Sequence, residues 1–567
     1  MRSRRRLAIA AILILAAIGG WLWWNRPRPV QMAAYAPSDA LIYIEIDDPP
    51  RLIASLSDTD SWGAILNGFP ALKDLLRWKG LIAWTGLGRA RDVVLARSQV
   101  ALVVLSLETS KDREALNIRP HTALLVETHT NEGRTRRVVE ELVGDLAHRV
   151  YGAPRIERRY TGEGETILWI APKGDRQIIA AISGSLVVIG NDEATVQSCL
   201  AVKRGERASL RENARLEQMR QRVAGRDSLA FGYVSPQGLD ELMRLLTTAY
   251  AVQLFDNPRV QSAAAIILPQ LAEKSLQDMA WSMRTAAGKV EDRYLFALPG
   301  DLAARLKAPL APSDDPIHSA ERMLPSDTYQ MTRYNYRDPN AAWDGVKSAV
   351  SSLLDPLIAP LAGRVLDAAL QPYGIESPRD FLRAAGPEIV TAQLSPEDST
   401  RILIARARDE DALRSEVRRY LGAVRRVSVE GVEVLVPLDP KRRAACFIDD
   451  YLIMGPEDHL RRCLQARATT RTLADEPSYR EANSPLGRTK AQPMMVTYSL
   501  ENERARGIAR TLASDAFDAA TTERIFAKNA YAVTETELVE DGLARRTRSA
   551  FGLLGDLIAQ IISGVGG

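Results

Sequence analysis

The segment IAAISGSLVVIG at 179–190 matches the segment AACFIDDYLIMG at 444–455 without a gap. Each segment contains two short apolar runs around a polar turn, which is Ser-Gly-Ser in the first and Asp-Asp in the second. Such runs are typical of two β-strands joined in a hairpin. A hairpin that is present twice in one chain predicts a fold built from two related units.

Further matches lie upstream of this hairpin. The segment TALLVET at 122–128 matches RILIARA at 401–407, and PSDALIYIEID at 37–47 matches PSDTYQMTRYN at 325–335. The spacing between matching segments decreases along the chain, from 288 to 279 to 265 residues. Loop deletions between two copies would produce this ordered decrease, whereas chance matches would scatter.

The matches divide the chain into parts. A length of 567 residues is too great for one hydrophobic core. We expect two tandem related domains, at 31–306 and 322–567. Residues 307–321 between them are rich in proline and contain the polar run 313–315, as is typical of a linker.

Hydrophobic periodicity indicates the fold class. Ile42, Ile44 and Ile46 alternate with other side chains, as in a strand with one buried face. Residues 136–148 instead place apolar side chains at helical spacing. Strands paired in sequence and interrupted by packed helices predict the α+β class, with a mixed, mainly antiparallel sheet in each domain.

The N-terminus predicts a membrane anchor over residues 1–30. Four of residues 2–6 are arginine, and Leu7–Trp24 is a run of 18 uncharged residues that ends in three tryptophans among its last four positions. A helix of this length covers about 27 Å, close to the hydrocarbon thickness of a bilayer. The arginines place the N-terminus in the cytoplasm. We therefore expect a single-pass protein of the bacterial inner membrane with a periplasmic or otherwise extracytoplasmic body.

A cleaved signal peptide is the alternative, because small residues occur at Ala17 and Gly19. We favour a retained anchor, since the apolar run continues into the tryptophans instead of a polar cleavage region. Residues 25–37 then form an extended tether, in keeping with their prolines.

The predicted anchor, the Pro-Ser-Asp start of the first strand and Gly86 followed by Arg91 and Asp92 carry a resemblance to a known family. The chain resembles uncharacterised bacterial proteins that are N-terminally anchored and exported, defined only as domain of unknown function 3352. The resemblance implies an exported, anchored protein. It transfers no catalytic residue.

Composition and motifs exclude several classes of function. The net charge is only +3, from 74 basic and 71 acidic residues, which gives no reason to expect nucleic-acid binding. The sequence contains no phosphate-binding glycine loop and no nucleophile elbow. Of the five histidines only His121 and His129 are close, on either side of one predicted strand. The sequence therefore predicts no cofactor and no metal, and catalytic residues stay unknown.

The cysteines Cys199, Cys446 and Cys463 are too few for a disulfide scaffold. They form either one disulfide with a remaining thiol or three buried thiols. Cys199 and Cys463 occupy corresponding places in the two units, as small apolar side chains of a helix would.

Two acidic pairs, Asp47-Asp48 and Asp449-Asp450, could share a proton or hold a cation. We favour a structural role, because each pair precedes a proline or joins predicted strands.

Other acidic residues are also assigned structural roles. Asp39 and Asp327 of the repeated Pro-Ser-Asp are expected to form turns. Asp92 and Asp380, each preceded by an arginine, are expected to cap helices.

The C-terminal segment 551–567 places apolar residues at helical spacing and has one charged side chain, Asp556. It forms either an interfacial helix on a membrane or a last helix packed on the second unit. We favour packing, because interfacial helices are usually rich in Lys or Arg.

These features predict a non-enzymatic binding or scaffold protein of the cell envelope. It would be held in the membrane through residues 7–24 and bind an envelope protein or polymer. The alternative is an extracytoplasmic hydrolase whose active-site residues meet only in the folded chain.

Overall fold

The computed structural model describes residues 27–68, 70–112, 115–161, 164–254, 258–314, 320–397, 400–483, 492–513, 520, 522–523, 526 and 530–566. The predicted anchor at 7–24 lies outside these residues. Within the part that is described, none of the helices is long and apolar enough to cross a membrane.

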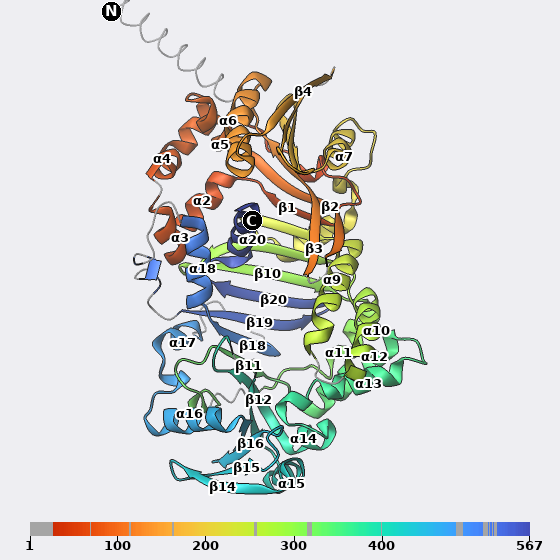
Figure 1. Cartoon of the computed structure of the whole chain (residues 1–567), viewed down its shortest axis with the longest axis vertical. Coiled ribbons are helices and arrows are strands. Elements are labelled where there is room, and N and C mark those ends of the chain that lie inside the picture. Colours follow the sequence, from red (N-terminus) through yellow and green to blue (C-terminus); the bar gives the residue numbers. More distant parts are fainter. Residues whose placement is uncertain are drawn as a thin grey trace, which may run out of the picture.

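The described strands form a single sheet of twenty strands in which every pairing is antiparallel, and helices pack against it (Figure 1). The α+β class and the mainly antiparallel pairing are thus confirmed, but the described strands form one continuous sheet and not a separate sheet in each of two domains. In chain order the strands are β1 (Ile42–Ile46), β2 (Gln99–Asp112), β3 (Ala115–Glu127), β4 (Arg155–Thr161), β5 (Gly164–Ile170), β6 (Gln177–Ser183), β7 (Leu186–Gly190), β8 (Ala230–Val234), β9 (Met279–Ala286), β10 (Lys289–Ala297), β11 (Gln330–Tyr334), β12 (Ala385–Gln393), β13 (Ile402–Ala407), β14 (Val424–Val429), β15 (Val432–Pro437), β16 (Ala444–Ile448), β17 (Tyr451–Gly455), β18 (Met495–Leu500), β19 (Tyr531–Val539) and β20 (Gly542–Ser549).

The first ten strands and the last ten follow the same order in the sheet. Residue pairing gives β4-β5-β6-β7-β3-β2-β1-β8-β9-β10 for one half of the chain. It gives β14-β15-β16-β17-β13-β12-β11-β18-β19-β20 for the other. Leu125 pairs with Val188 in the first half, and Ile404 pairs with Ile453 in the second. These pairs stand 279 and 265 residues apart, the spacings of the matching sequence segments.

The two halves are joined by β10 and β20, which form one continuous ladder from Val290–Ser549 to Ala297–Gly542. At its centre Arg293 pairs with Arg546, and two arginines side by side would repel one another. The buried Glu291 lies between them, 2.9 Å from Arg293 and 3.8 Å from Arg546. Burial raises the pKa of Glu291, but Arg546, Arg293 and Arg284 outweigh it and hold this pKa below its ordinary value.

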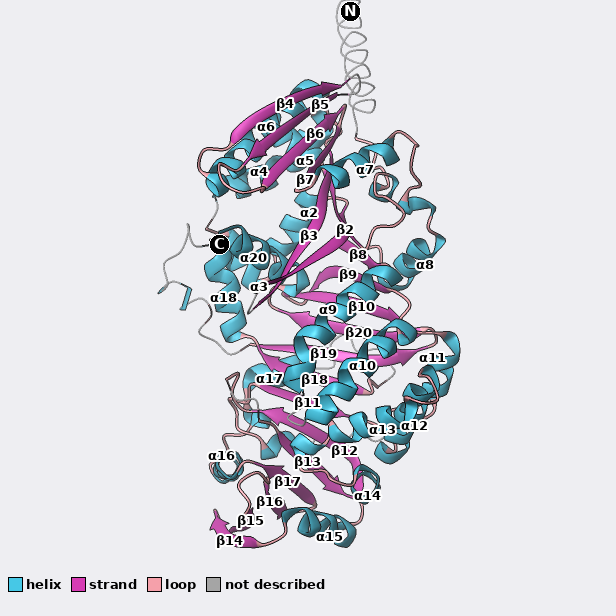
Figure 2. Ribbon diagram, turned by 45° about the vertical axis from the view of Figure 1, so that its right-hand side comes forward, coloured by secondary structure: helices cyan, strands magenta, loops and turns pink. Residues whose placement is uncertain are grey.

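Helices cover the sheet and cross the boundary between the halves. Helix α10, the second helix between β8 and β9, contacts α12 and α13 of the second half, as Figure 2 shows, while the helix after β18 contacts α3 of the first. The α-helices are α2 (Pro49–Ser57), α3 (Asp60–Leu66), α4 (Pro70–Thr85), α5 (Ala90–Arg97), α6 (Glu132–Tyr151), α7 (Glu193–Lys203), α8 (Ala214–Val223), α9 (Pro236–Leu254), α10 (Pro258–Ser275), α11 (Gly300–Lys307), α12 (Pro339–Leu353), α13 (Ala359–Ala368), α14 (Pro378–Ala384), α15 (Glu410–Leu421), α16 (Glu457–Ala468), α17 (Pro477–Ala482), α18 (Asn502–Ala513) and α20 (Gly552–Gly566). Short 3-10 turns are η1 (Met32–Ala34), η2 (Leu210–Glu212), η3 (Ala320–Met323), η4 (Gln371–Tyr373) and η5 (Leu473–Asp475).

The C-terminal segment is a helix that packs on the second half, as predicted, but it also packs on the first half. Phe551 is buried and meets Trp62 of α3 edge to face at 5.4 Å between ring centroids. The Trp62 indole N–H also donates to the Phe551 carbonyl at 3.1 Å. The segment therefore packs on the first half as well as the second, because β20 lies beside β10.

Both segments predicted as connectors are packed in their described parts. Residues 27–37 do not form a free tether, since Met32 and Ala36 are fully buried and Pro37 bridges to Ser209. Residues 307–314 likewise pack, with Leu310 buried and the Ser313 N–H donating to the Asn335 carbonyl at 2.8 Å. Apolar residues between the prolines account for both departures.

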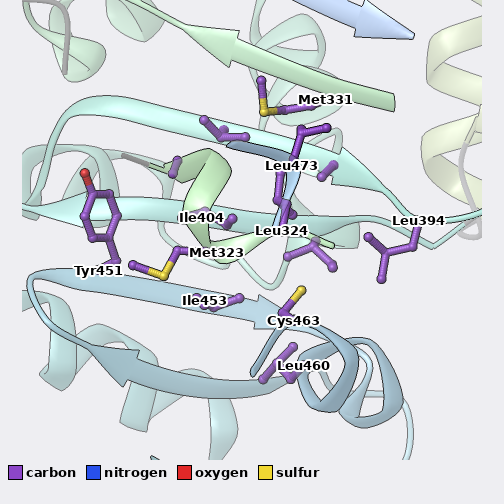
Figure 3. Close-up of a cluster of buried hydrophobic side chains, with 14 of the residues drawn as sticks. Met323, Leu324, Met331, Leu394, Ile404, Tyr451, Ile453, Leu460, Cys463 and Leu473 are labelled. Carbon is purple, nitrogen blue, oxygen red and sulfur yellow. The ribbon is translucent and has the colours of Figure 1, made fainter. Parts of the chain in front are cut away.

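Each half also has a core of its own. Figure 3 shows that of the second half, where Met323 and Leu324 pack with Met331 of β11, Ile453 of β17 and Cys463 of α16. The corresponding core of the first half includes Cys199 of α7.

Candidate functional site

In the first half, polar side chains of three neighbouring strands lie together where the ends of these strands meet. We call this row of strand ends the edge of the half. Strand β1 ends where β2 begins and β3 ends, because successive strands are antiparallel. Glu45 of β1, Gln99 of β2 and Glu127 of β3 are all buried at this edge. Buried polar groups need partners, so their contacts determine the chemistry of the edge.

A cleft opens over this edge as two adjoining cavities of about 800 and 470 Å³. Glu45, Asp47, Asp48, Glu217 and Arg220 line both cavities. The larger cavity is also lined by the N-terminal segment, by the ends of α4 and α5, by the start of β2, by the loop after β3, and by η2 and α8. These residues are Pro27, Pro29, Val30, Gln31, Ala33, Ala83, Ala96, Arg97, Ser98, Gln99, His129, Arg211 and Leu216.

The two adjacent aspartates of the cleft have different roles. Asp48 caps α2, accepting from the Arg51 N–H at 2.8 Å, so its predicted structural role is confirmed. Asp47 faces the solvent of the cleft and accepts one hydrogen bond, from the Gln99 amide at 3.1 Å. Partial burial raises the pKa of Asp47 against the effect of that hydrogen bond, and the Asp48 charge raises it further. No cation of the described residues forms an ion pair with Asp47.

The Gln99 side chain ties the cleft to the N-terminal segment. Its amide group donates to the Val30 carbonyl at 3.0 Å, and its carbonyl accepts from the Val30 N–H at 2.8 Å. The same carbonyl oxygen lies 2.9 Å from Nε2 of His129, which must therefore carry the proton on that nitrogen. The other ring nitrogen lies 4.0 Å from Glu127. Burial lowers the pKa of His129, Glu127 opposes this, and Arg97 lowers it further.

The floor of the cleft is an ion pair. Arg220 of α8 contacts Glu45, whose second oxygen accepts from the Tyr43 hydroxyl at 2.5 Å. The Arg220 guanidinium also lies over the Phe231 ring, 4.3 Å from its centroid. Burial raises the pKa of Tyr43, so this hydroxyl stays a hydrogen-bond donor. Arg220 also lies 3.5 Å from Glu217, so the two carboxylates of the floor share this one guanidinium.

The rim carries free positive charge. Arg51, Arg211 and Arg226 are exposed, and no carboxylate of the described residues lies within ion-pairing distance of them. Among the described residues, the cleft therefore presents two carboxylates without an ion-pairing cation, Asp47 and the helix-capping Asp48, and three available guanidinium groups around them.

No family model matches the chain, and neither does any curated protein or solved structure.

The same edge of the second half is closed. The pairing register puts Arg333 of β11 where β1 has Glu45, and Glu388 of β12 where β2 has Gln99. Arg333 is buried, donating to Glu321 at 2.9 Å and lying 4.0 Å from Glu388. The Tyr451 hydroxyl donates to Glu388 at 2.6 Å. An ion-paired core fills the space that is a cleft in the first half.

The other acidic residues chosen from the sequence are structural. Asp449 has a φ of 52° in the turn between β16 and β17 and pairs with Arg467 at 3.0 Å. Asp450 pairs with Arg406 at 2.5 Å. The structural interpretation of this pair is confirmed.

The Pro-Ser-Asp aspartates do more than form turns. Asp39 pairs with Arg207 at 2.5 Å, and Asp327 pairs with Arg462 at 3.0 Å. Each ion pair joins the start of a half to the region of its α7 or α16 helix.

The prediction that Asp92 and Asp380 cap helices was wrong in detail. Both lie within the first turn of their helices, and the cap positions are Arg89 and Ser377. The Ser377 hydroxyl donates to Asp380 at 2.7 Å, so this aspartate still supports the helix start.

The histidines that the structure describes do not converge on one site. His121 lies 3.2 Å from Glu108 and 3.4 Å from Asp192. Burial lowers the pKa of His121, but these two carboxylates outweigh it and raise the pKa overall. His318 lies outside the described residues. Within the described residues no group of three or more His, Cys, Asp or Glu side chains could hold a metal ion.

All three cysteines are free and buried. Burial raises the pKa of Cys199 and of Cys446 to about 12, and raises that of Cys463 further. Thiols of this kind are unreactive side chains of the core.

Sequence reasoning missed the cleft. It assigned Asp47 to a structural role together with Asp48, and it gave no part to Glu45, Gln99 or Arg220. One signal was present, since Glu45, Gln99 and His129 all lie at strand ends that an antiparallel arrangement brings to one edge.

Proposed function

We propose that the chain is a membrane-anchored, extracytoplasmic binding protein, and that the cleft of its first half is the binding site. The observation that carries the proposal is the open cleft, with the uncompensated Asp47 inside and free arginines on its rim. A pocket with few convergent polar groups is the ordinary form of a ligand site.

The charges of the cleft favour a ligand with groups of both signs. An amino or guanidinium group beside Asp47 would replace water around a carboxylate whose pKa burial already raises. Arg51, Arg211 and Arg226 would bind carboxylate groups, which guanidinium recognises well. A short peptide segment carries both, as part of an envelope protein or of a peptide-bearing envelope polymer.

One observation favours a hydrolase instead, namely a carboxyl and an imidazole in the same cavity. However, the Nε2 proton of His129 is directed at Gln99, and its other ring nitrogen faces Glu127. Neither nitrogen is therefore positioned toward a substrate as a general base requires. We give binding precedence for this reason.

We further propose that the two halves are tandem related domains, a first over 31–306 and a second over 322–567. The common strand order and the matching segment spacings support this duplication. In this proposal the first domain has the open binding site, and the second domain has a structural role.

Binding can be tested by calorimetry with a defined probe pair, trialanine and N-acetyltrialanine. We expect the full-length protein to bind trialanine and to bind the acetylated form about tenfold more weakly, because acetylation removes the amine that Asp47 recognises. The variant Asp47→Asn should lose that preference. Asp175→Asn, an exposed change away from the cleft, is the matched control. Equal binding of both peptides, or none, would contradict the proposed ligand class.

The location can be tested separately. A reporter that is active only outside the cytoplasm, fused after Gly567, should be active, and the protein should remain in the membrane after carbonate extraction. Recovery of the chain in the soluble fraction would contradict the retained anchor while leaving the peptide-binding result untouched.

A further inference from the structure

Helix α4 carries large apolar side chains that no described part of the protein covers. Trp78 is 54% exposed, Leu81 53% and Trp84 46%, and Leu87 just beyond the helix is 64% exposed. Isolated exposed leucines are common, but two tryptophans and two leucines within ten residues form a patch. Such patches mark contact with a membrane or with another protein.

The patch is held in place by bonds to the rest of the first half. Arg97 donates to the Ala83 carbonyl at 2.8 Å, and Lys79 donates to the Pro50 carbonyl at 3.0 Å. Arg134 donates to the Gly86 carbonyl at 3.1 Å, just after the helix. The apolar face is thus turned outward on a fixed helix and not on a free loop.

The patch also adjoins the point where the predicted anchor enters the body. Ala83 of α4 and Pro27 line the same cavity. The predicted membrane-spanning run ends at Trp24, so only two residues separate it from Pro27. The three residue steps from Trp24 to Pro27 extend at most about 11 Å, which leaves the membrane surface close to this end of the body. Figure 1 shows α4, α5 and α6 together at this end, with α15 and β14 at the other.

The chemistry of the patch suits the interface between lipid and water. Indole rings favour the level of the lipid head groups, where tryptophan is enriched. Arg77 and Arg89 are exposed beside the patch, and the Arg77 guanidinium lies 5.8 Å from the Trp78 ring. Basic side chains next to apolar ones are typical of helices that lie on a membrane.

We propose that α4 rests on the lipid bilayer, with Trp78, Leu81 and Trp84 in the interfacial layer. The contact makes a second attachment beside the anchor and holds the cleft mouth at the membrane surface. This inference rests on the anchor and location given under the proposed function. In this arrangement the ligands of the cleft are molecules that are present at the membrane surface.

A fluorescent probe on the patch can test this. In the variant Leu81→Cys the full-length protein is labelled with an environment-sensitive dye, while the native cysteines stay unreactive because they are buried. The labelled protein is placed in nanodiscs of phosphatidylethanolamine and phosphatidylglycerol, with or without spin-labelled lipid. We expect spin-labelled lipid to quench the dye by about half, since interfacial helices lie about 5–10 Å into the head-group region. A dye on Leu438→Cys, 66% exposed on the second half, is the matched control and should be unaffected.

Two outcomes would overturn the proposal. Equal quenching at both positions, or none at position 81, would show that α4 does not meet lipid. Cross-linking of two Leu81→Cys chains without quenching would show that another copy covers the patch. Carbonate extraction of the same samples reports on the anchor independently, so a loose α4 is distinguishable from a missing anchor. In an anchored protein, Trp78→Ser with Trp84→Ser should abolish the quenching at position 81 and leave the melting temperature unchanged.

Discussion

The two halves of this chain place different polar groups at the same point of the same strand order. In the first half Glu45 and Gln99 border an open cleft, and Asp47 beside them keeps an uncompensated carboxylate. In the second half Arg333 and Glu388 occupy the corresponding positions and are sealed in a buried network.

The difference shows that this scaffold accepts polar residues at a strand edge in two ways. Where charges are matched inside the protein, as around the buried Arg333, they act as structural partners. Where one carboxylate is left over, water or a ligand must supply its partner. The same edge can therefore hold a buried structural network in one half and an open binding site in the other.

The largest expected effect concerns the sealed network. Arg333→Met removes the cation that pairs with the buried Glu321 and lies 4.0 Å from the buried Glu388, and removal of one partner of a buried ion pair costs about 3–5 kcal/mol. The matched change Arg220→Met in the first half should cost clearly less, because Glu45 adjoins a cleft that admits water. Urea unfolding of the two variants measures the difference. Equal losses would show that the two edges are equally closed.

A second substitution tests whether the halves unfold as one body. Phe551 follows the last strand but packs against Trp62 of the first half. Phe551→Ala should therefore lower the free energy of unfolding by about 3–5 kcal/mol and destabilise both halves together. Calorimetry should show one transition shifted downward. Leu438→Ala, at an exposed site, should change stability by less than about 0.5 kcal/mol. Two separate transitions, with only one of them shifted, would contradict a shared core.

A buried carboxyl group beside the end of β20, that of Glu501, also makes stability depend on pH. Burial raises the pKa of Glu501 from 4.5 to about 7, although the Ala550 N–H that donates to it acts in the opposite direction. This contribution to stability is therefore fully present below pH 4.5 and is lost as pH rises through about 7. The loss attributable to this group is about 3 kcal/mol.

Glu501→Gln should flatten the fall in melting temperature between these two pH values. Asp292, whose pKa burial raises to about 6, should keep a weaker fall in the same direction. A Glu501→Gln protein with the original pH profile would show that this carboxylate is not desolvated in the folded chain.

The smallest effects come from exchanging the side chains that distinguish the two edges. By the pairing register, Asp47 of the first half corresponds to Asn335 of the second. Asp47→Asn should raise stability at pH 7 by less than about 1 kcal/mol, because it removes a partly desolvated charge and keeps the acceptor for Gln99. Asn335→Asp should lower it by a similar amount, since its amide donates to the Gln492 oxygen at 3.2 Å. Melting temperatures that move in the same direction would remove the contrast between the edges.

Much of the scaffold could be predicted from local patterns. The hairpin at 179–190, the strand Ile42–Ile46 and the helix after residue 131 all follow from periodicity and turn residues. The shared edge of β10 and β20 could not be predicted, because nothing in the alternation within β10 indicates which strand will lie beside it.

The site was hidden for a different reason. Asp47 and Asp48 are neighbours with the same side chain, and only their surroundings separate a helix cap from a cleft residue. Those surroundings come from Val30, Gln99 and Arg220, which are distant in the sequence. The local spacing of residues in the sequence does not show that these distant side chains lie together in the fold.

The ladder between β10 and β20 has a consequence for how the protein is made. Strand β10 ends at Ala297, and its partner begins at Gly542. At 5–20 residues per second a ribosome needs roughly ten to fifty seconds to make the intervening chain. During that time a finished first half would expose an open strand edge, which is prone to pair with other chains. A nascent chain of this design needs either a chaperone over β10 or a delay in folding until translation has passed residue 549.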